Sequence, residues 1–233
     1  MALITTAPKE KQPEIMERVY DRKLEHLLEG GLSMDEAASA IKSFPPEVRT
    51  SALGDLVDYL AHYDPKASLD ALAEYFPSNP DMWSVMLRRR AEIMEQLGYD
   101  DFGEVSAFLQ DQLKKGLDPK VYRVAVQQLT ADVARQDIEE ARATVEAIAD
   151  PVVREGCTKV LLDYWKGGDP FGAASYVSTL PAGHGRDLAI ETLLPSLVFA
   201  SAKRDEVLAL ASSEDVRAAL RAGKKLETEP GKP

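Results

Sequence analysis

The sequence predicts an all-α protein made of consecutive antiparallel pairs of helices. Apolar residues recur at helical spacing along nearly the whole chain, and no segment alternates with a period of two. Val, Ile and Thr do not cluster between turn residues as they would in β-hairpins. The predicted helices are joined by links of only a few residues, which force successive helices to lie antiparallel. Two stripes show the helical spacing, one formed by Trp83, Met86, Leu87, Ile93, Met94 and Leu97, the other by Val152, Val153, Val160, Leu161, Tyr164 and Trp165.

Helix starts are marked by Asp-Pro or Asn-Pro pairs. The Asp or Asn side chain accepts hydrogen bonds from free amides of the first turn, and Pro at the first helical position sacrifices no helical hydrogen bond. Ser33 and Glu36 add a capping box, in which each side chain satisfies a backbone amide of the other residue. The pairs are Asp64-Pro65, Asn79-Pro80, Asp118-Pro119, Asp150-Pro151 and Asp169-Pro170.

Helix ends are marked by Gly or Pro, and joining starts to ends predicts about a dozen helices. These end signals are Gly30-Gly31, Phe76-Pro77, Gly98, Gly116, Gly167-Gly168 and Leu180-Pro181. The predicted helices span residues 14–29, 34–43, 46–62, 65–76, 80–98, 101–115, 119–135, 138–149, 151–166, 170–180, 185–201 and 204–211, with a short helix from residue 214. Pro195 is expected to kink the helix over 185–201, because proline has no amide proton to donate.

The helical periodicity covers residues 14–221, which we expect to form a single helical-repeat domain. Residues 1–13 and 222–233 combine Pro, Lys, Glu and Gly without apolar periodicity. Segments of this composition do not bury enough apolar surface to offset the entropy of ordering. We therefore expect a disordered N-terminal arm and a disordered C-terminal tail.

A pattern recurs from pair to pair: an Arg early in the first helix, an apolar residue and an Asp at its end, and a small residue one turn into the second helix. The repeated arginines lie roughly 30 to 40 residues apart, the period of two-helix repeats. We expect each of them to lie beside the end of the preceding helix, where carbonyl groups lack helical partners. They are Arg49, Arg88, Arg123, Arg154 and Arg186.

One copy of the pattern is the segment from Trp165 to Ala174, with Asp169-Pro170 at its centre, followed by Leu180-Pro181. The period and hairpin layout over residues 46–211 resemble α-solenoid proteins of the tetratricopeptide and HEAT types, and this copy is similar to repeats in bacterial helical proteins. The resemblance implies a right-handed-type α-solenoid of about six antiparallel helix pairs. No copy carries both the Trp-x-x-Leu-Gly opening and the Ala-x-x-x-Phe pattern of tetratricopeptide repeats, so their peptide-clamp residues are not carried over.

The acidic balance indicates the kind of partner. With 28 basic and 39 acidic residues, the formal net charge is -11. Nucleic acids and anionic membranes attract Lys and Arg, so neither is expected as a partner. A protein with a basic or neutral surface is the favoured partner. The first residues lack the features of a signal peptide and no apolar run is long enough to span a membrane, which predicts a cytoplasmic protein.

Residues able to support catalysis or metal binding are scattered. His26, His62 and His184 are isolated from one another, and Asp58 lies one helical turn from His62. That pair could supply two metal ligands, but a solvent-facing pair is favoured because further ligands are missing. Cys157 lies in an apolar run and is expected to be a buried thiol rather than a nucleophile. We therefore predict no enzyme activity, no cofactor and no metal site.

Three other charged segments have simpler structural explanations. Asp100-Asp101 is interpreted as helix capping rather than an acidic metal cluster. Gly183-His184-Gly185-Arg186 is read as a turn between helices rather than an anion site. Helical geometry spreads Arg88-Arg89-Arg90 around the helix, so the three are not expected to face one ligand.

Most large aromatic residues at helical spacing are expected in the core, among them Trp83, Trp165, Tyr164, Tyr122 and Phe171. Tyrosines are the better candidates for a partner-binding surface, because tyrosine keeps one polar end in water. The predicted partner-binding residues are Tyr59, Tyr63, Tyr75 and Tyr99. The leading prediction is a non-catalytic protein–protein interaction module, an adaptor or scaffold. The alternatives are a self-associating structural subunit, and an enzyme or small-ligand binder with a pocket between hairpins.

Overall fold

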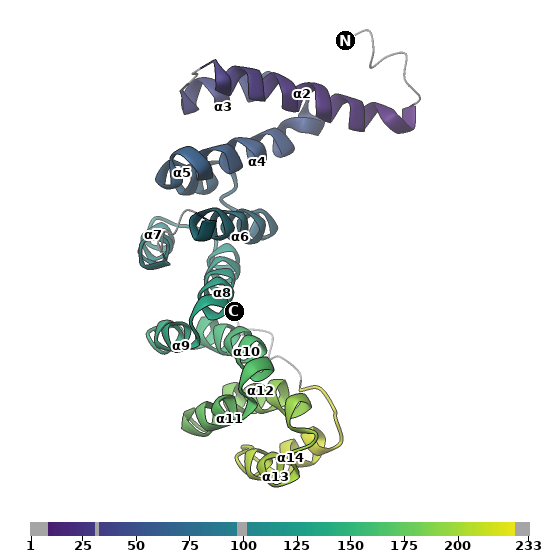
Figure 1. Cartoon of the computed structure of the whole chain (residues 1–233), viewed down its shortest axis with the longest axis vertical. Coiled ribbons are helices and arrows are strands. Elements are labelled where there is room, and N and C mark those ends of the chain that lie inside the picture. Colours follow the sequence, from purple (N-terminus) through teal and green to yellow (C-terminus); the bar gives the residue numbers. More distant parts are fainter. Residues whose placement is uncertain (1–8, 31–32, 97–101, 227–233) are drawn as a thin grey trace. The chain divides into compact units, whose positions relative to one another are not determined.

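The computed structural model describes residues 9–30, 33–96 and 102–226 (Figure 1). These residues form helices connected by short links, and no strand occurs among them, which confirms the all-α prediction. The chain forms two compact units, Met1–Tyr122 and Arg123–Pro233, which are described separately below. Tyr99, Asp100 and Asp101 lie outside the described residues.

In the first unit, a one-turn 3₁₀ helix, η1 (Lys9–Lys11), leads into the long helix α2. Helix α4 is central, because it packs against α2, α3, α5 and α6. Leu56 and Val57 of α4 are buried in this packing. The helices are α2 (Gln12–Glu29), α3 (Met34–Lys42), α4 (Pro46–Tyr63), α5 (Pro65–Tyr75), α6 (Pro80–Gln96) and α7 (Phe102–Lys114).

In the second unit, α10 is central and packs against α9, α11 and α12. Helix α8 begins just before this unit and lies mainly within it. Leu161 and Leu162 of α10 are fully buried. The helices are α8 (Pro119–Gln136), α9 (Ile138–Glu146), α10 (Pro151–Gly168), α11 (Pro170–Thr179), α12 (His184–Leu193), the 3₁₀ helix η2 (Leu194–Leu197), α13 (Ser201–Ala209) and α14 (Glu214–Arg221).

A single aspartate joins the two helices of a pair at three places. The backbone N–H of Asp64 donates to Leu60 O at the end of α4, while its side chain accepts from Ala67 N in α5. Asp137 joins α8 to α9 and Asp169 joins α10 to α11 in the same way. One residue therefore ends one helix and starts the next, so the two helices turn back on each other.

Where one helix pair follows another, a side chain near the start of the following helix bonds to the end of the preceding helix. Arg49, the fourth residue of α4, donates from Nε to Phe44 O over 2.7 Å. Arg154 donates to Ile148 O and Arg186 to Leu180 O, each over 3.4 Å. The expectation that these arginines lie beside the end of the preceding helix is confirmed at the three positions. Such a bond satisfies a carbonyl that has no helical partner.

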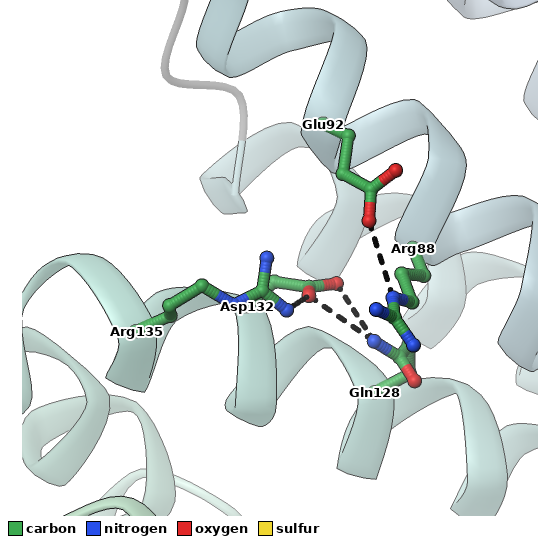
Figure 2. Close-up of polar contacts among 5 residues, drawn as sticks. All are labelled: Arg88, Glu92, Gln128, Asp132 and Arg135. Carbon is green, nitrogen blue, oxygen red and sulfur yellow. Dashed lines mark hydrogen bonds and ion pairs between the residues drawn. The ribbon is translucent and has the colours of Figure 1, made fainter.

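Arg88 does not take this role. It is the ninth residue of α6, too far from the joint, and its Nε pairs with Glu92 of the same helix over 3.2 Å (Figure 2). The fourth residue of α6 is Trp83, whose indole N–H donates to Phe76 O over 2.8 Å. The sequence alignment of the repeated arginines was therefore out of register at this pair, because an indole replaces the guanidinium.

The helix predicted over residues 185–201 is wrong in its second half. Helix α12 ends at Leu193, η2 covers Leu194–Leu197, and α13 begins at Ser201. Pro195 cannot donate a backbone hydrogen bond, and its ring is crowded by the carbonyl one turn earlier, so it ends the helix rather than kinking it. A smaller difference concerns Gly167-Gly168, which forms the last turn of α10 because Asp169 N–H closes the helix on Trp165 O.

Candidate partner-binding groove

A groove of about 770 Å³ lies between α2 and α4 of the first unit. Its floor includes the buried side chains of Leu24 and Leu28, while its walls are mainly polar. The groove is open, so a segment of another chain has access to it. The lining residues are Asp21, Leu24, Glu25, Leu28, Glu29, Asp55, Asp58, Tyr59, His62 and Tyr63.

Five carboxyl groups converge on this groove from two helices. Those of α2 follow helical spacing of four residues, which places them on one face of that helix. Asp58 is paired with Arg89 of α6, with 3.1 Å between Oδ2 and Nη1. The groove therefore attracts cations. The five carboxyl groups are those of Asp21, Glu25 and Glu29 on α2 and of Asp55 and Asp58 on α4.

Asp21 of α2 and Asp55 of α4 both line the groove, and each carboxyl group affects the pKa of the other. Partial burial, followed by the charge of Asp21, the hydrogen bond to it and the charge of Asp58, raises the pKa of Asp55 to about 6. Arg89 opposes this rise. Burial and the charge of Glu17 also raise the pKa of Asp21. Asp55 therefore keeps its proton to a higher pH than an ordinary aspartate does.

Asp55→Asn is expected to stabilise the first unit at pH 7 by about 1 to 2 kcal/mol, after discounting for solvent exposure. The folded-state pKa of Asp55 lies above its unfolded value, so its contribution favours the folded state at about pH 4 and is lost as the pH rises through 6. The gain should therefore vanish near pH 4. Urea unfolding at both pH values measures it. An equal gain at both would show that ionisation of Asp55 is not the cause.

Two of the four predicted partner-binding tyrosines lie together in the groove. The rings of Tyr59 and Tyr63 are 4.5 Å apart between centroids, and Tyr63 is 74% exposed. Tyr75 is half-buried at the end of α5 and does not line the groove. Tyr99 lies outside the described residues.

The acidic residues of α2 were not singled out from sequence, although Asp21, Glu25 and Glu29 share the spacing that would have revealed one acidic face. Of the ionisable side chains other than tyrosine that line the groove, the sequence pointed only to Asp58 and His62. His62 Nδ1 lies 3.0 Å from the backbone oxygen of Asp58, so the pair is linked through the main chain rather than arranged around a metal. Among the described residues, no group of three or more His, Cys, Asp or Glu is placed to hold a metal ion.

The three consecutive arginines contact three different groups. Arg88 pairs with Glu92, Arg89 with Asp58, and Arg90 donates to Pro65 O over 3.4 Å. The prediction that they do not face one ligand is therefore confirmed.

Within α8 of the second unit, Asp132 is buried and accepts from Gln128 and Arg135 of its own helix (Figure 2).

Cys157 is fully buried in α10, as predicted. Burial raises the pKa of its thiol to about 11, opposed by a hydrogen bond with Thr130. A thiol with this pKa is almost entirely protonated at neutral pH, and only the thiolate is a good nucleophile. The structure therefore offers no activation of Cys157.

A cavity of about 520 Å³ in the second unit surrounds the loop before α12. His184 Nε2 lies 3.6 Å from Glu155 Oε1, and Arg154 and Arg186 donate to helix-end carbonyls. The reading of Gly183-His184-Gly185-Arg186 as a turn between helices holds only for Gly183, because His184, Gly185 and Arg186 form the first turn of α12.

Two aromatic residues expected in the core lie on the surface instead. Phe171 is 54% exposed and Tyr164 is 41% exposed, whereas Trp83 and Trp165 are buried as expected. Phe171 follows Pro170 in the first turn of α11. It lines a shallow cavity with Phe199, whose side chain is fully exposed.

Comparison with protein-family models, curated proteins and solved structures finds no match to this chain. None of the helices in the described ranges combines the length and apolar character needed to cross a membrane.

Proposed function

We propose that the chain is a non-catalytic protein–protein interaction module, an adaptor or scaffold, whose α2–α4 groove binds a basic segment of another protein. The observation that carries this proposal is the convergence of five carboxyl groups beside a pair of tyrosines, of which Tyr63 is exposed. Carboxylates select Lys or Arg, and tyrosine rings supply apolar contact area and a face for a cation. Tyr59 and Tyr63 are the proposed contacts.

The apolar floor of the groove favours a protein segment over a small cation. Leu24 and Leu28 provide a strip that a leucine or valine of the partner can cover, while charged residues beside it reach the carboxylates. An amphipathic basic segment matches both features.

We also propose that the helix pairs stack as a right-handed-type α-solenoid of about six pairs in the cytoplasm. The recurrence of two joint geometries, through Asp64, Asp137 and Asp169 and through Arg49, Arg154 and Arg186, supports a repeated unit. A single reduced cysteine suits the cytoplasm.

The test is selection from a displayed library of random peptides against the full chain. We expect enrichment of peptides that combine Lys or Arg with aliphatic residues. Glu25→Lys with Glu29→Lys reverses two exposed charges of the groove and should weaken the selected peptides about 100-fold, because each reversal adds repulsion to lost attraction.

The matched control is Glu74→Lys with Glu95→Lys, two exposed residues of the same unit that do not line the groove. It makes the same change in net charge and should leave affinity within about twofold. Equal weakening of peptide binding by both double variants would show that the change in net charge, rather than the groove, causes the loss. Peptides without enrichment of basic residues would refute the proposal.

A further inference from the structure

One face of the second unit exposes apolar side chains that the described part of the chain leaves uncovered. Phe199, in the turn between η2 and α13, is fully exposed, and its neighbour Val198 is more than half exposed. Phe171, in the first turn of α11, is also half exposed. Helices α11 and α13 pack against each other, so Phe171 and Phe199 lie on one surface (Figure 1). Exposed phenylalanines that share a surface indicate a contact with another molecule.

This surface contains both a hollow and a projection. The hollow is a shallow cavity of about 540 Å³ between α11 and the start of α13. Phe199 forms one edge of it and is also the most exposed apolar side chain of the surface. In a two-fold contact, each copy can therefore insert this ring into the hollow of the other. We call the surface the Phe171–Phe199 face, and its residues are Phe171, Ser175, Phe199, Ala200, Ser201, Ala202, Lys203 and Glu206.

The distribution of charge favours a second copy as the occupant of this face. The whole chain has a formal net charge of -11, so two copies repel each other in most orientations. The charged members of the Phe171–Phe199 face are Lys203 and Glu206, one turn apart on α13 and 3.0 Å apart between Nζ and Oε2. The formal charge of the face is therefore zero. Two such faces can meet without repulsion, and a two-fold axis can place Lys203 of each copy against Glu206 of the other.

We propose that the chain forms a two-fold symmetric dimer through the Phe171–Phe199 face. Phe199 of each copy enters the hollow between α11 and α13 of the other copy, and Lys203 and Glu206 pair across the axis. The contact uses residues of the second unit alone. It is therefore independent of the groove between α2 and α4 and of the basic partner proposed for that groove.

The size of the face predicts a weak dimer. Its exposed apolar side chains can bury about 300 to 500 Å² per copy, whereas a stable interface buries roughly 800 Å² per partner. We expect a dissociation constant of about 10 to 100 µM. Raising the salt concentration from about 50 mM to about 500 mM should strengthen the dimer about threefold, because salt screens the repulsion between two acidic copies. Binding of a basic segment in the groove should weaken over the same range.

Sedimentation equilibrium of the full chain, from about 1 µM to about 300 µM, measures this dissociation constant. Phe199→Ser should raise the dissociation constant about tenfold or more. Urea unfolding should be unchanged, because this side chain is fully exposed. The matched control is Val152→Ser, which removes an exposed apolar side chain of the same unit outside the face. It should leave the dissociation constant within about twofold.

Two charge reversals test whether the occupant is a second copy. Lys203→Glu gives the face two acidic side chains and Glu206→Lys gives it two basic ones, so each variant alone should dimerise about three- to tenfold more weakly. An equimolar mixture of the two variants should recover dimers that contain one copy of each, because unlike charges meet again. The mixed pair has the same total charge as two wild-type copies, so net charge does not explain the recovery.

Three results would overturn the proposal. The first is a chain that stays monomeric at about 300 µM, and the second is a dimer that Phe199→Ser leaves unchanged. The third is a mixture of the two charge variants that associates no better than either variant alone. If the monomer instead binds vesicles of neutral lipid and Phe199→Ser abolishes that binding, the face belongs to a lipid surface and the dimer is likewise refuted.

Discussion

Replacing Trp83 with alanine is expected to lower the free energy of unfolding of the first unit by about 3 to 5 kcal/mol. Trp83 is fully buried, and its indole N–H closes the joint between α5 and α6 on Phe76 O. The substitution therefore opens a large cavity and leaves a helix-end carbonyl without its donor. Urea unfolding followed by circular dichroism measures the loss.

A matched variant separates packing from the hydrogen bond. Trp83→Phe fills most of the space but cannot donate, so it should cost less than alanine, about 1 to 3 kcal/mol. Trp165 lies in the second unit and is then the only remaining tryptophan, so its fluorescence reports on that unit in both variants. A loss below about 1 kcal/mol for Trp83→Ala would show that the joint does not depend on this side chain.

Asp187→Ala is expected to destabilise the second unit by about 2 to 4 kcal/mol. Asp187 is only 3% exposed, and its carboxylate accepts from Ser212 N over 2.9 Å and from Ser212 Oγ. These bonds attach the link between α13 and α14 to the first turn of α12. Alanine removes the buried carboxylate and leaves the two donors of Ser212, which is itself exposed, without their acceptor.

The rate at which the single cysteine is labelled measures the destabilisation caused by Asp187→Ala. Cys157 is buried in the same unit, so a thiol reagent reaches it only when that unit opens. A loss of 2 kcal/mol should speed labelling roughly 30-fold. Asp187→Asn retains one acceptor oxygen and should fall between wild type and alanine. Unchanged labelling in Asp187→Ala would mean that this link does not stabilise the packing around α10.

Helix starts could be predicted from the sequence because their cause is local. Asp64, Asp150 and Asp169 cap amides two or three residues away, and this geometry depends on little else. Helix ends were harder to predict. Gly167-Gly168 forms the last turn of α10 because the backbone N–H of Asp169 bonds to Trp165 O. The glycines alone do not indicate in the sequence that the helix continues through them.

The groove could be predicted only in part. Tyr59 and Tyr63 are neighbours on one helix, so their pairing follows from helical spacing alone. The meeting of Asp21 with Asp55 depends on which face of α2 packs on α4, and residues 34 apart in sequence give no local sign of it. Packing between helices, rather than any motif, creates the site.

The side-chain bonds that close the joints also bear on how the chain acquires its structure. Arg49, Arg154 and Arg186 reach carbonyls only five or six residues before them. Closing so short a loop costs little entropy and takes well under a microsecond. Each turn can therefore form as soon as its own residues have left the ribosome, without waiting for the rest of the chain. Folding is expected to be fast and to proceed hairpin by hairpin from the N-terminus.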